Sequence, residues 1–301
     1  MTKISFMAFA KGKESKESNS IQRFVGITPV TVLAVNPDKK TLEELYNTTL
    51  EDEPKYISEI EVEGTKIPSV RVDFIVKSTI NPDFISKITF FIRKEYRFNR
   101  DKTKVQVIDK YGRTAWVTKD ELNNHIIPVS ANGNKINVDK DYRPCYRGEE
   151  DITKFFITYL EIPSVMKYNR DNGTWYMSEN TEDSIARLDN VEDYFKGDFS
   201  ELKTALSLRP NNKIKAMFGV RTTSEGNQYQ TCFTELFLKL NDKKVEKFEA
   251  ALKERKDLGA YPNAEFYVGE LKPYTVEPTD FASKDEFSSP ESTDEEKLPW
   301  E

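Results

Sequence analysis

Residues 87–113 combine basic and aromatic side chains in a pattern suited to binding a nucleic acid. This 27-residue segment holds nine basic and three acidic residues, a net charge of +6. Lysine and arginine neutralise phosphates and release counterions, which gives affinity without sequence preference. Aromatic rings stack on unpaired bases at about 1–3 kcal/mol each, and a duplex hides its base faces, so the pattern favours single-stranded DNA. The rings of this stretch are Phe90, Phe91, Tyr96, Phe98 and Tyr111, with Trp116 just beyond.

We expect the DNA contacts to come from three stretches. The first, within and just after residues 87–113, supplies Arg93, Lys94, Arg97, Lys104, Tyr111, Arg113 and Trp116. The second precedes a predicted helix and contains Tyr142, Arg143, Tyr146 and Arg147. The third is a closing hairpin with Lys215, Arg221 and Tyr229, where Phe218 and Phe233 could serve as core or as platform. Neighbours in a strand point to opposite faces, so one of Phe90 and Phe91 should be buried and the other not. An ordinary solvated charged face is the alternative.

The acidity of the chain is concentrated at its C-terminal end. Residues 277–301 carry nine acidic and two basic residues, whereas residues 1–276 carry 42 acidic and 43 basic ones. We expect residues 276–301 to form a disordered acidic tail, which could compete with DNA for a basic groove. Its tip is compact and apolar and predicts a short anchor for a partner protein: Leu298, Pro299 and Trp300. A purely solubilising tail is the alternative reading.

Residue types argue against catalysis, a metal site and a membrane span. One histidine (His125) and two cysteines (Cys145 and Cys232, with no CxxC pair) cannot build a four-ligand zinc site without carboxylates. The sequence has no phosphate-binding glycine loop and no nucleophile–base constellation. No apolar run approaches the roughly 20 residues that a membrane span needs. We therefore predict a cytoplasmic, reduced, non-enzymatic protein without a cofactor or bound metal.

The periodicity of the chain predicts strands first, helices next and a hairpin last. Alternating or β-branched runs predict strands over residues 24–35, 70–77, 88–96, 105–108 and 111–117, and a hairpin of 214–220 with 229–240 around a turn at 224–227. Helical spacing follows a capping box at residue 41 and recurs over 149–160, 185–208 and 242–259.

This order predicts a β-rich α+β fold with a five-stranded oligonucleotide-binding (OB) barrel. We expect a flexible arm over residues 1–20, a DNA-binding core over 21–275 with a helical insertion at about 149–210, and the tail over 276–301. Strand order alone does not require the barrel to close. A β-sandwich with helices on one face is therefore the alternative.

Two resemblances extend this prediction. The acidic tail and its apolar-Pro-aromatic tip resemble the C-terminus of bacterial single-stranded DNA-binding proteins, although Trp300 replaces the usual Phe and Glu301 follows it. Within residues 24–160, four segments resemble single-stranded DNA-binding proteins of tailed bacteriophages: 30–37 (VTVLAVNP), 70–77 (VRVDFIVK), 109–116 (DKYGRTAW) and 146–150 (YRGEE).

The phage family implies an OB barrel and a role in DNA replication and recombination in the host cytoplasm. It also implies a polymerase, helicase or primase as the partner of the tail. Some members carry a zinc site, for which this chain lacks the Cys/His set. A phage structural or assembly protein that uses the same body for protein contacts is the alternative, and homo-oligomerisation stays open.

Overall fold

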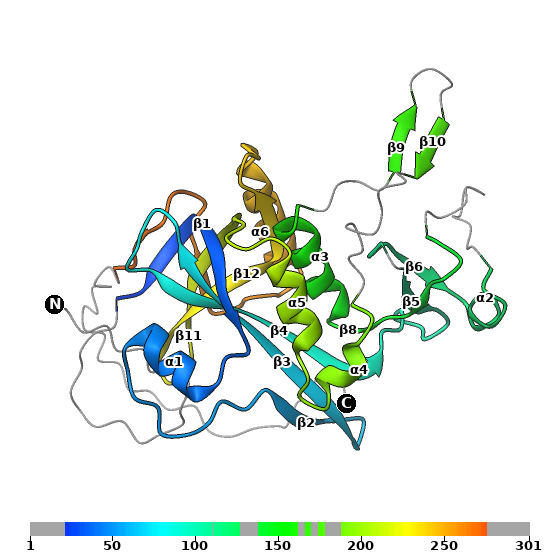
Figure 1. Ribbon diagram of the computed structural model, residues 1–301, viewed down its shortest axis with the longest axis horizontal. Coiled ribbons are helices and arrows are strands. Elements are labelled where there is room, and N and C mark those ends of the chain that lie inside the picture. The colour runs from blue at the N-terminus through cyan, green and yellow to red at the C-terminus, as the bar shows by residue number, and fades with distance from the viewer. Residues whose placement is uncertain are drawn as a thin grey trace, which may run out of the picture.

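The protein is built around one curled antiparallel sheet (Figure 1). The computed structural model describes residues 22–109, 111–126, 138–161 and 188–275, together with the backbone of 166–169 and 174–177. The predicted N-terminal arm and acidic tail, with Leu298, Pro299 and Trp300, lie outside the described residues.

Fourteen strands and six helices are described. The strands are β1 (Phe24–Val35), β2 (Ile57–Val62), β3 (Thr65–Ser78), β4 (Ile85–Tyr96), β5 (Val105–Ile108), β6 (Thr114–Val117), β7 (Arg143–Pro144), β8 (Tyr146–Arg147), β9 (Met166–Asn169), β10 (Thr174–Met177), β11 (Ile214–Thr222), β12 (Gln228–Lys239), β13 (Ala264–Phe266) and β14 (Lys272–Pro273). The helices are α1 (Lys39–Tyr46), α2 (Lys119–Asn123), α3 (Glu149–Tyr159), α4 (Val191–Tyr194), α5 (Ser200–Ser207) and α6 (Glu246–Asp257).

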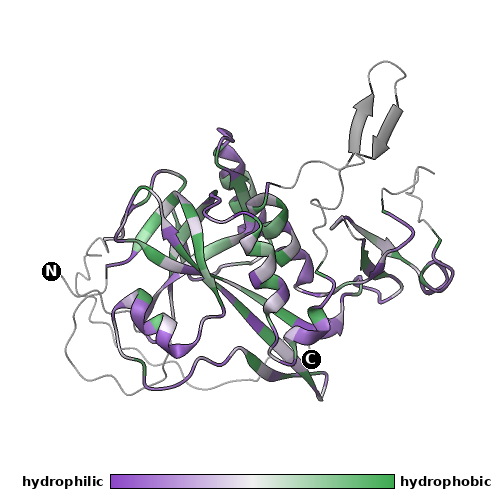
Figure 2. Ribbon diagram, in the orientation of Figure 1, coloured by the Kyte–Doolittle hydropathy of each residue, from purple (hydrophilic) through white to green (hydrophobic). Residues whose placement is uncertain are grey.

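The large sheet runs in the order β12-β11-β1-β3-β4-β8. Strand β2 pairs with β3, β13 with β11, and β14 with β1. The sheet curls so far that β12, at the end of this order, contacts β4. The result is a half-barrel in which polar and apolar residues alternate along the strands (Figure 2). This confirms the predicted β-rich antiparallel core.

Helix α3 fills the concave side of the half-barrel with aromatic rings. Its Phe155 lies 4.6 Å, centroid to centroid, from Phe74 of β3 and 5.6 Å from Phe90 of β4. Phe237 of β12 approaches Phe155 within 5.3 Å, so one helix contacts strands from both ends of the curl. The alternation predicted for residues 70–77 is confirmed, because Val70, Val72, Phe74 and Val76 all face this core.

The convex side of the sheet is covered by two other helices and left open in one place. Helix α6 packs Phe248 and Leu252 against β11 and β12, whereas α1 packs Leu42 and Tyr46 against Ile75 of β3. On the outer face of β3 and β4, Phe91 is 57% exposed. The prediction that one of Phe90 and Phe91 is buried is confirmed, since Phe90 is only 4% exposed.

Residues 97–145 depart from the expected continuous meander. Strands β5 and β6 do not extend the large sheet but form a separate three-stranded sheet with β7, in the order β6-β5-β7. This unit has its own core, in which Val107 and Val117 pack with Tyr142 beside α2. Strand β6 begins at Thr114 rather than at residue 111, because the backbone N–H groups of Tyr111 and Arg113 donate hydrogen bonds to the buried carboxylate of Asp109 instead of to a neighbouring strand.

The insertion expected to be helical is mixed. Between α3 and α5 the chain also forms the β9–β10 hairpin, with Tyr168 opposite Trp175 in its register. The predicted helical region over 185–208 is two short helices, α4 and α5, separated by a turn. Strand β2 and helix α2 were not predicted, although a capping box of Thr118 and Glu121 marks the start of α2.

Replacing Phe155 by Ala tests whether its ring holds the curled sheet together. Because this side chain is fully buried among five other rings, Phe155→Ala should lower the free energy of unfolding by about 3–5 kcal/mol. Urea denaturation measures the loss. Leu258→Ala, at a position 71% exposed, serves as the control and should stay within about 0.5 kcal/mol of the parent. A loss below about 1 kcal/mol for Phe155→Ala would contradict this role.

Candidate nucleic-acid interface

The open outer face of β3 and β4 carries one exposed aromatic ring among basic side chains. Phe91 of β4 pairs directly with Arg71 of β3, and Arg93, two residues further along β4, points to the same side. Lys87 and Thr89 precede Phe91 on this side and pair with Ile75 and Asp73. We call Arg71, Lys87, Phe91, Arg93 and the neighbouring Arg147 the β3–β4 face.

A buried carboxylate positions two of these cations. Asp73 is fully buried; its Oδ1 accepts a hydrogen bond of 2.8 Å from the Thr89 hydroxyl. Its Oδ2 lies 3.2 Å from Arg71 Nε, in an ion pair without hydrogen-bond geometry, and 3.7 Å from Lys87 Nζ. Burial lowers the pKa of Lys87 despite this carboxylate. Asp73 therefore holds both cations on this side of the sheet, Arg71 directly opposite Phe91 and Lys87 four residues before it on β4.

The other end of the face holds two guanidinium groups around one carboxylate. Arg147 of β8 pairs with Arg93, and Glu95 lies 3.3 Å from Arg147 and 4.0 Å from Arg93. Arg147 keeps 52% of its side chain exposed. Gly148 allows this packing: at its φ of 90°, a Cβ would lie 1.9 Å from the carbonyl oxygen of Phe91. Counted together, the face has four cations and two carboxylates.

Beyond Arg93, the side chains of β4 anchor α4. Lys94 forms an ion pair of 2.9 Å with Glu192 and lies 5.6 Å from the centroid of Phe195. Tyr146 donates a hydrogen bond to the same carboxylate and stacks on Tyr96 at 5.2 Å. The hydrogen bonds from Tyr146 and Lys94 lower the pKa of Glu192. Of this group Tyr96 is the most open ring, at 45% exposed.

Arginines already cover two rings of the separate three-stranded unit. Arg97 lies 5.8 Å from the Trp116 centroid and donates a hydrogen bond of 2.7 Å to Glu150 at the start of α3. Arg113 lies 4.8 Å from the centroid of Tyr111, which is 7% exposed. Such cation–π pairs contribute about 0.5–1 kcal/mol at exposed sites. Arg97 and Trp116 thus adjoin the β3–β4 face as a preformed pair.

Two predicted contacts have internal roles. Tyr142 is 1% exposed, and its single O–H lies within hydrogen-bond distance of two carbonyl oxygens, those of Glu121 at 2.7 Å and Ile126 at 2.8 Å, so no ring face is open to a base. Arg143 pairs at 2.5 Å with the fully buried Glu149. Burial would lower the pKa of Arg143, but the hydrogen bonds and charge of Glu149 outweigh burial and raise it.

The predicted hairpin residues lie elsewhere on the sheet. Lys215 donates a hydrogen bond of 2.6 Å to the carbonyl oxygen of Asp242. Arg221 and Tyr229 are cross-strand partners at the exposed end of β11 and β12. Both candidate platform rings of the hairpin, Phe218 and Phe233, are fully buried and belong to the core.

The predicted contact Lys104 is exposed and lies just before β5. Two basic residues of the β3–β4 face, Arg71 and Lys87, were not among the predicted DNA contacts. The alternation of residues 70–77 pointed to Arg71, since it placed this side chain opposite the buried face.

Within the described residues, no group of three His, Cys, Asp or Glu side chains could hold a metal ion. Both Cys145 and Cys232 are buried thiols, and burial raises the pKa of each. None of the helices that the structure describes is long and apolar enough to cross a membrane.

Removing the charge of Arg143 or of Arg147 should separate an internal role from a surface role. Arg143→Gln leaves the buried Glu149 without its cation and should lower the free energy of unfolding by about 3 kcal/mol. Arg147→Gln loses only a half-exposed pair and should change it by less than about 1 kcal/mol. Urea denaturation of both variants measures the difference. Equal stabilities would mean that Arg143 is not needed to balance Glu149.

Comparison with protein families, with characterised proteins and with solved structures finds no match to this chain. Its function must therefore be inferred from the chemistry of the β3–β4 face and its surroundings. That face combines an open ring, pre-positioned cations and a rigid sheet.

Proposed function

We propose that the protein binds single-stranded DNA without sequence preference through the β3–β4 face. The observation that carries the proposal is Phe91, more than half exposed between Arg71 and Arg93 on a rigid sheet. A base can stack on this ring while the cations contact the phosphates on either side. Cations alone would bind the phosphates of duplex and single-stranded DNA alike, so the exposed ring is the feature that favours single-stranded DNA.

We further propose that the half-barrel is an OB barrel. Five of its strands support this: β1, β3, β4, β11 and β12 in chain order, with β1 between β3 and β11 and with β12 in contact with β4. Helix α3 falls between the third and fourth of them and fills the barrel. OB folds bind oligonucleotides on the face of their second and third strands and on the loops after the first and fourth. In this chain those strands are β3 and β4, and the later loop is the hairpin of Arg221 and Tyr229.

For the tail, we propose recruitment of replication proteins and competition with DNA. The supporting features are its nine acidic residues and the apolar tip of Leu298, Pro299 and Trp300. A flexible tether gives the tail an effective concentration on the order of mM near a basic surface of the same molecule. Polymerase, helicase or primase is the class of partner that a role in replication and recombination requires.

The central test compares oligo(dT) with a duplex of equal length over a series of salt concentrations. The parent protein should bind oligo(dT) more tightly, and its affinity should fall with salt by a log–log slope of about −0.7 per phosphate contacted. Phe91→Ala should weaken oligo(dT) binding about 5- to 150-fold without changing this slope, since the ring contributes stacking rather than charge. Fluorescence anisotropy measures both quantities.

Two control variants keep this test specific. Leu208→Ala removes another exposed apolar side chain, 65% exposed at the C-terminal end of α5, and should leave affinity unchanged. Arg93→Gln should instead reduce the salt slope by about 0.7. Equal affinity for both DNA forms, or none for either, would overturn the proposal and favour a role in phage structure or assembly.

Deleting residues 277–301 should tighten oligo(dT) binding severalfold at low salt, because the deletion removes a segment with a net charge of −7 that competes with DNA for the basic surface. The gain should shrink as salt screens the tail. Replacing Leu298, Pro299 and Trp300 by Ala keeps the charge, so this variant should bind DNA like the parent yet lose the partner protein. Weaker DNA binding after deletion would contradict competition by the tail.

A further inference from the structure

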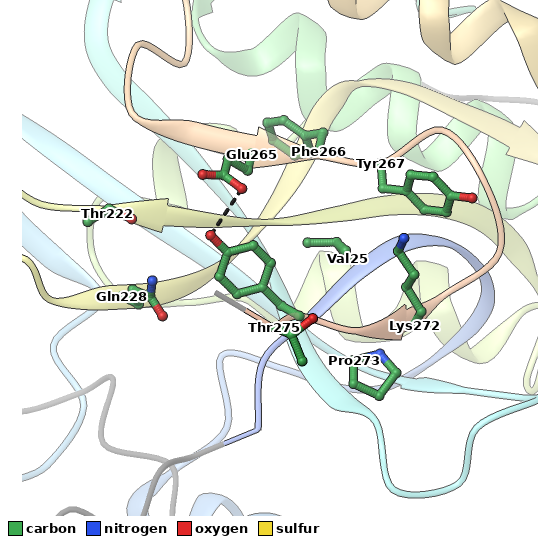
Figure 3. Close-up of a pocket in the computed structure, with 10 residues that line it drawn as sticks. Val25, Thr222, Gln228, Glu265, Phe266, Tyr267, Lys272, Pro273 and Thr275 are labelled. Atoms are coloured by element: carbon green, nitrogen blue, oxygen red, sulfur yellow. Dashed lines mark hydrogen bonds between the residues drawn. The ribbon is translucent and has the colours of Figure 1, made fainter. Parts of the chain in front are cut away.

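A polar pocket lies away from the β3–β4 face, where the last described segment crosses the sheet (Figure 3). Its volume is about 610 Å³, within the range of about 300–1,000 Å³ typical of small-molecule sites. Strands β11, β12, β13 and β14 and the start of β1 contribute its walls. The side chains that matter for binding are Thr222, Gln228, Glu265, Tyr267, Lys272 and Tyr274.

The backbone holds the walls of this pocket in place. Residues 264–275 form a strap in which β13 pairs with β11 and β14 pairs with β1. Two glycines let the strap lie directly on the sheet: a Cβ on Gly26 would come within 2.6 Å of the carbonyl oxygen of Glu270, and one on Gly219 within 2.3 Å of that of Glu265. The Tyr274 N–H donates to the Arg23 carbonyl oxygen at 2.8 Å. The pocket is therefore preformed.

One cation and one aromatic ring meet at the mouth of the pocket. Lys272 Nζ lies 4.0 Å from the centroid of Tyr267, and within the described chain it forms no ion pair. Tyr267 is 42% exposed. Gly269 accommodates its ring, because a Cβ there would lie 2.4 Å from a ring carbon. An anion could thus bind Lys272 without displacing a carboxylate.

The interior offers hydrogen-bonding groups of both kinds. Tyr274 donates a hydrogen bond of 3.0 Å to one oxygen of Glu265 (Figure 3), and partial burial together with this bond raises the pKa of the Tyr274 phenol. Among the residues described, no hydrogen bond is made by the second oxygen of Glu265, by the side-chain amide of Gln228 or by the Thr222 hydroxyl. Donors and acceptors of this kind can form hydrogen bonds with the edge of a base or with the hydroxyls of a sugar.

We propose that this pocket binds one nucleotide. The phosphate contacts Lys272, the base lies against the tyrosine rings, and the base edge or sugar hydroxyls bond to Gln228, Thr222 and Glu265. An acidic peptide fits poorly, because Glu265 offsets the single cation and would repel further carboxylates. A nucleotide combines one anionic group with a flat, hydrogen-bonding ring, and the pocket offers a partner for each part.

The nucleotide has two sources: a free nucleotide, or a nucleotide within a DNA strand bound to the protein. The second source rests on the proposed function. It is supported by position, since Arg221 pairs with Ala264 beside Glu265 and with exposed Tyr229, so a basic and aromatic hairpin adjoins the pocket. A strand reaching this hairpin could place one base in the pocket.

The full-length chain should be titrated with thymidine 5′-monophosphate and with oligo(dT), using isothermal titration calorimetry. Lys272→Gln should weaken binding of the monophosphate about tenfold or more, since it removes the charge-assisted contact to phosphate. Lys256→Gln, at an exposed lysine near the end of α6, is the matched control and should bind like the parent. Thermal unfolding of both variants verifies that the fold is intact.

Oligo(dT) distinguishes the two sources. A DNA-borne nucleotide predicts that Lys272→Gln also weakens oligo(dT) binding, and that 5-iododeoxyuridine in the strand crosslinks to Tyr267 or Tyr274. A free nucleotide predicts loss of monophosphate binding alone. If Lys272→Gln alters neither titration, the pocket proposal is overturned, even where Phe91→Ala still weakens oligo(dT). If no variant or parent binds oligo(dT) but the monophosphate still needs Lys272, only the proposed DNA-binding function fails.

Discussion

The alternation of side chains along β4 places one ring in the core of the protein and the next ring on its surface. Phe90 must face the concave side of the sheet, because there it packs on Phe155 of α3. Its neighbour Phe91 then has to point outward, since successive side chains of a strand alternate. The packing that holds the curled sheet together therefore also presents a ring to solvent. Gly148 completes this arrangement by letting the chain pass directly behind Phe91.

Three buried carboxylates hold basic side chains in fixed positions. Asp109 and Glu149 are fully buried and each holds an arginine, Arg113 or Arg143, that is less than one third exposed. A buried charge is tolerated only when it is paired, so the geometry of these arginines is fixed by the fold. Asp73 is buried in the same way and holds Arg71 and Lys87, whose side chains are 28% and 24% exposed, on the side of the sheet that carries Phe91. The same physical requirement thus fixes Arg113 and Arg143 at one end of the molecule and Arg71 and Lys87 along β3 and β4.

Local sequence was sufficient for the main strands of the curled sheet and for the expectation that one of Phe90 and Phe91 is buried, but it did not decide which of the two. The period of two in residues 70–77 follows from burial of one face, which needs no knowledge of the partner strand. Local sequence did not reveal the role of Tyr142, because a tyrosine followed by an arginine occurs both on protein surfaces and in cores. Its burial comes from Val107 and Val117, which lie 25 or more positions away. For Arg143 the partner is close in sequence, but the sequence does not show that Glu149, the first residue of α3, is fully buried.

The sequence by itself determined composition, charge distribution and period: a β-rich body, a basic and aromatic stretch at 87–113, and an acidic C-terminal end. These are properties of neighbours along the chain. Only the tertiary structure decided which cations stay open and which rings are covered, because ion pairs such as Lys94 with Glu192 join residues about one hundred positions apart. It alone assembled the pocket of Tyr267 and Lys272, whose walls come from both ends of the described chain. Packing between distant strands, which leaves no local period, is the physical reason for this division.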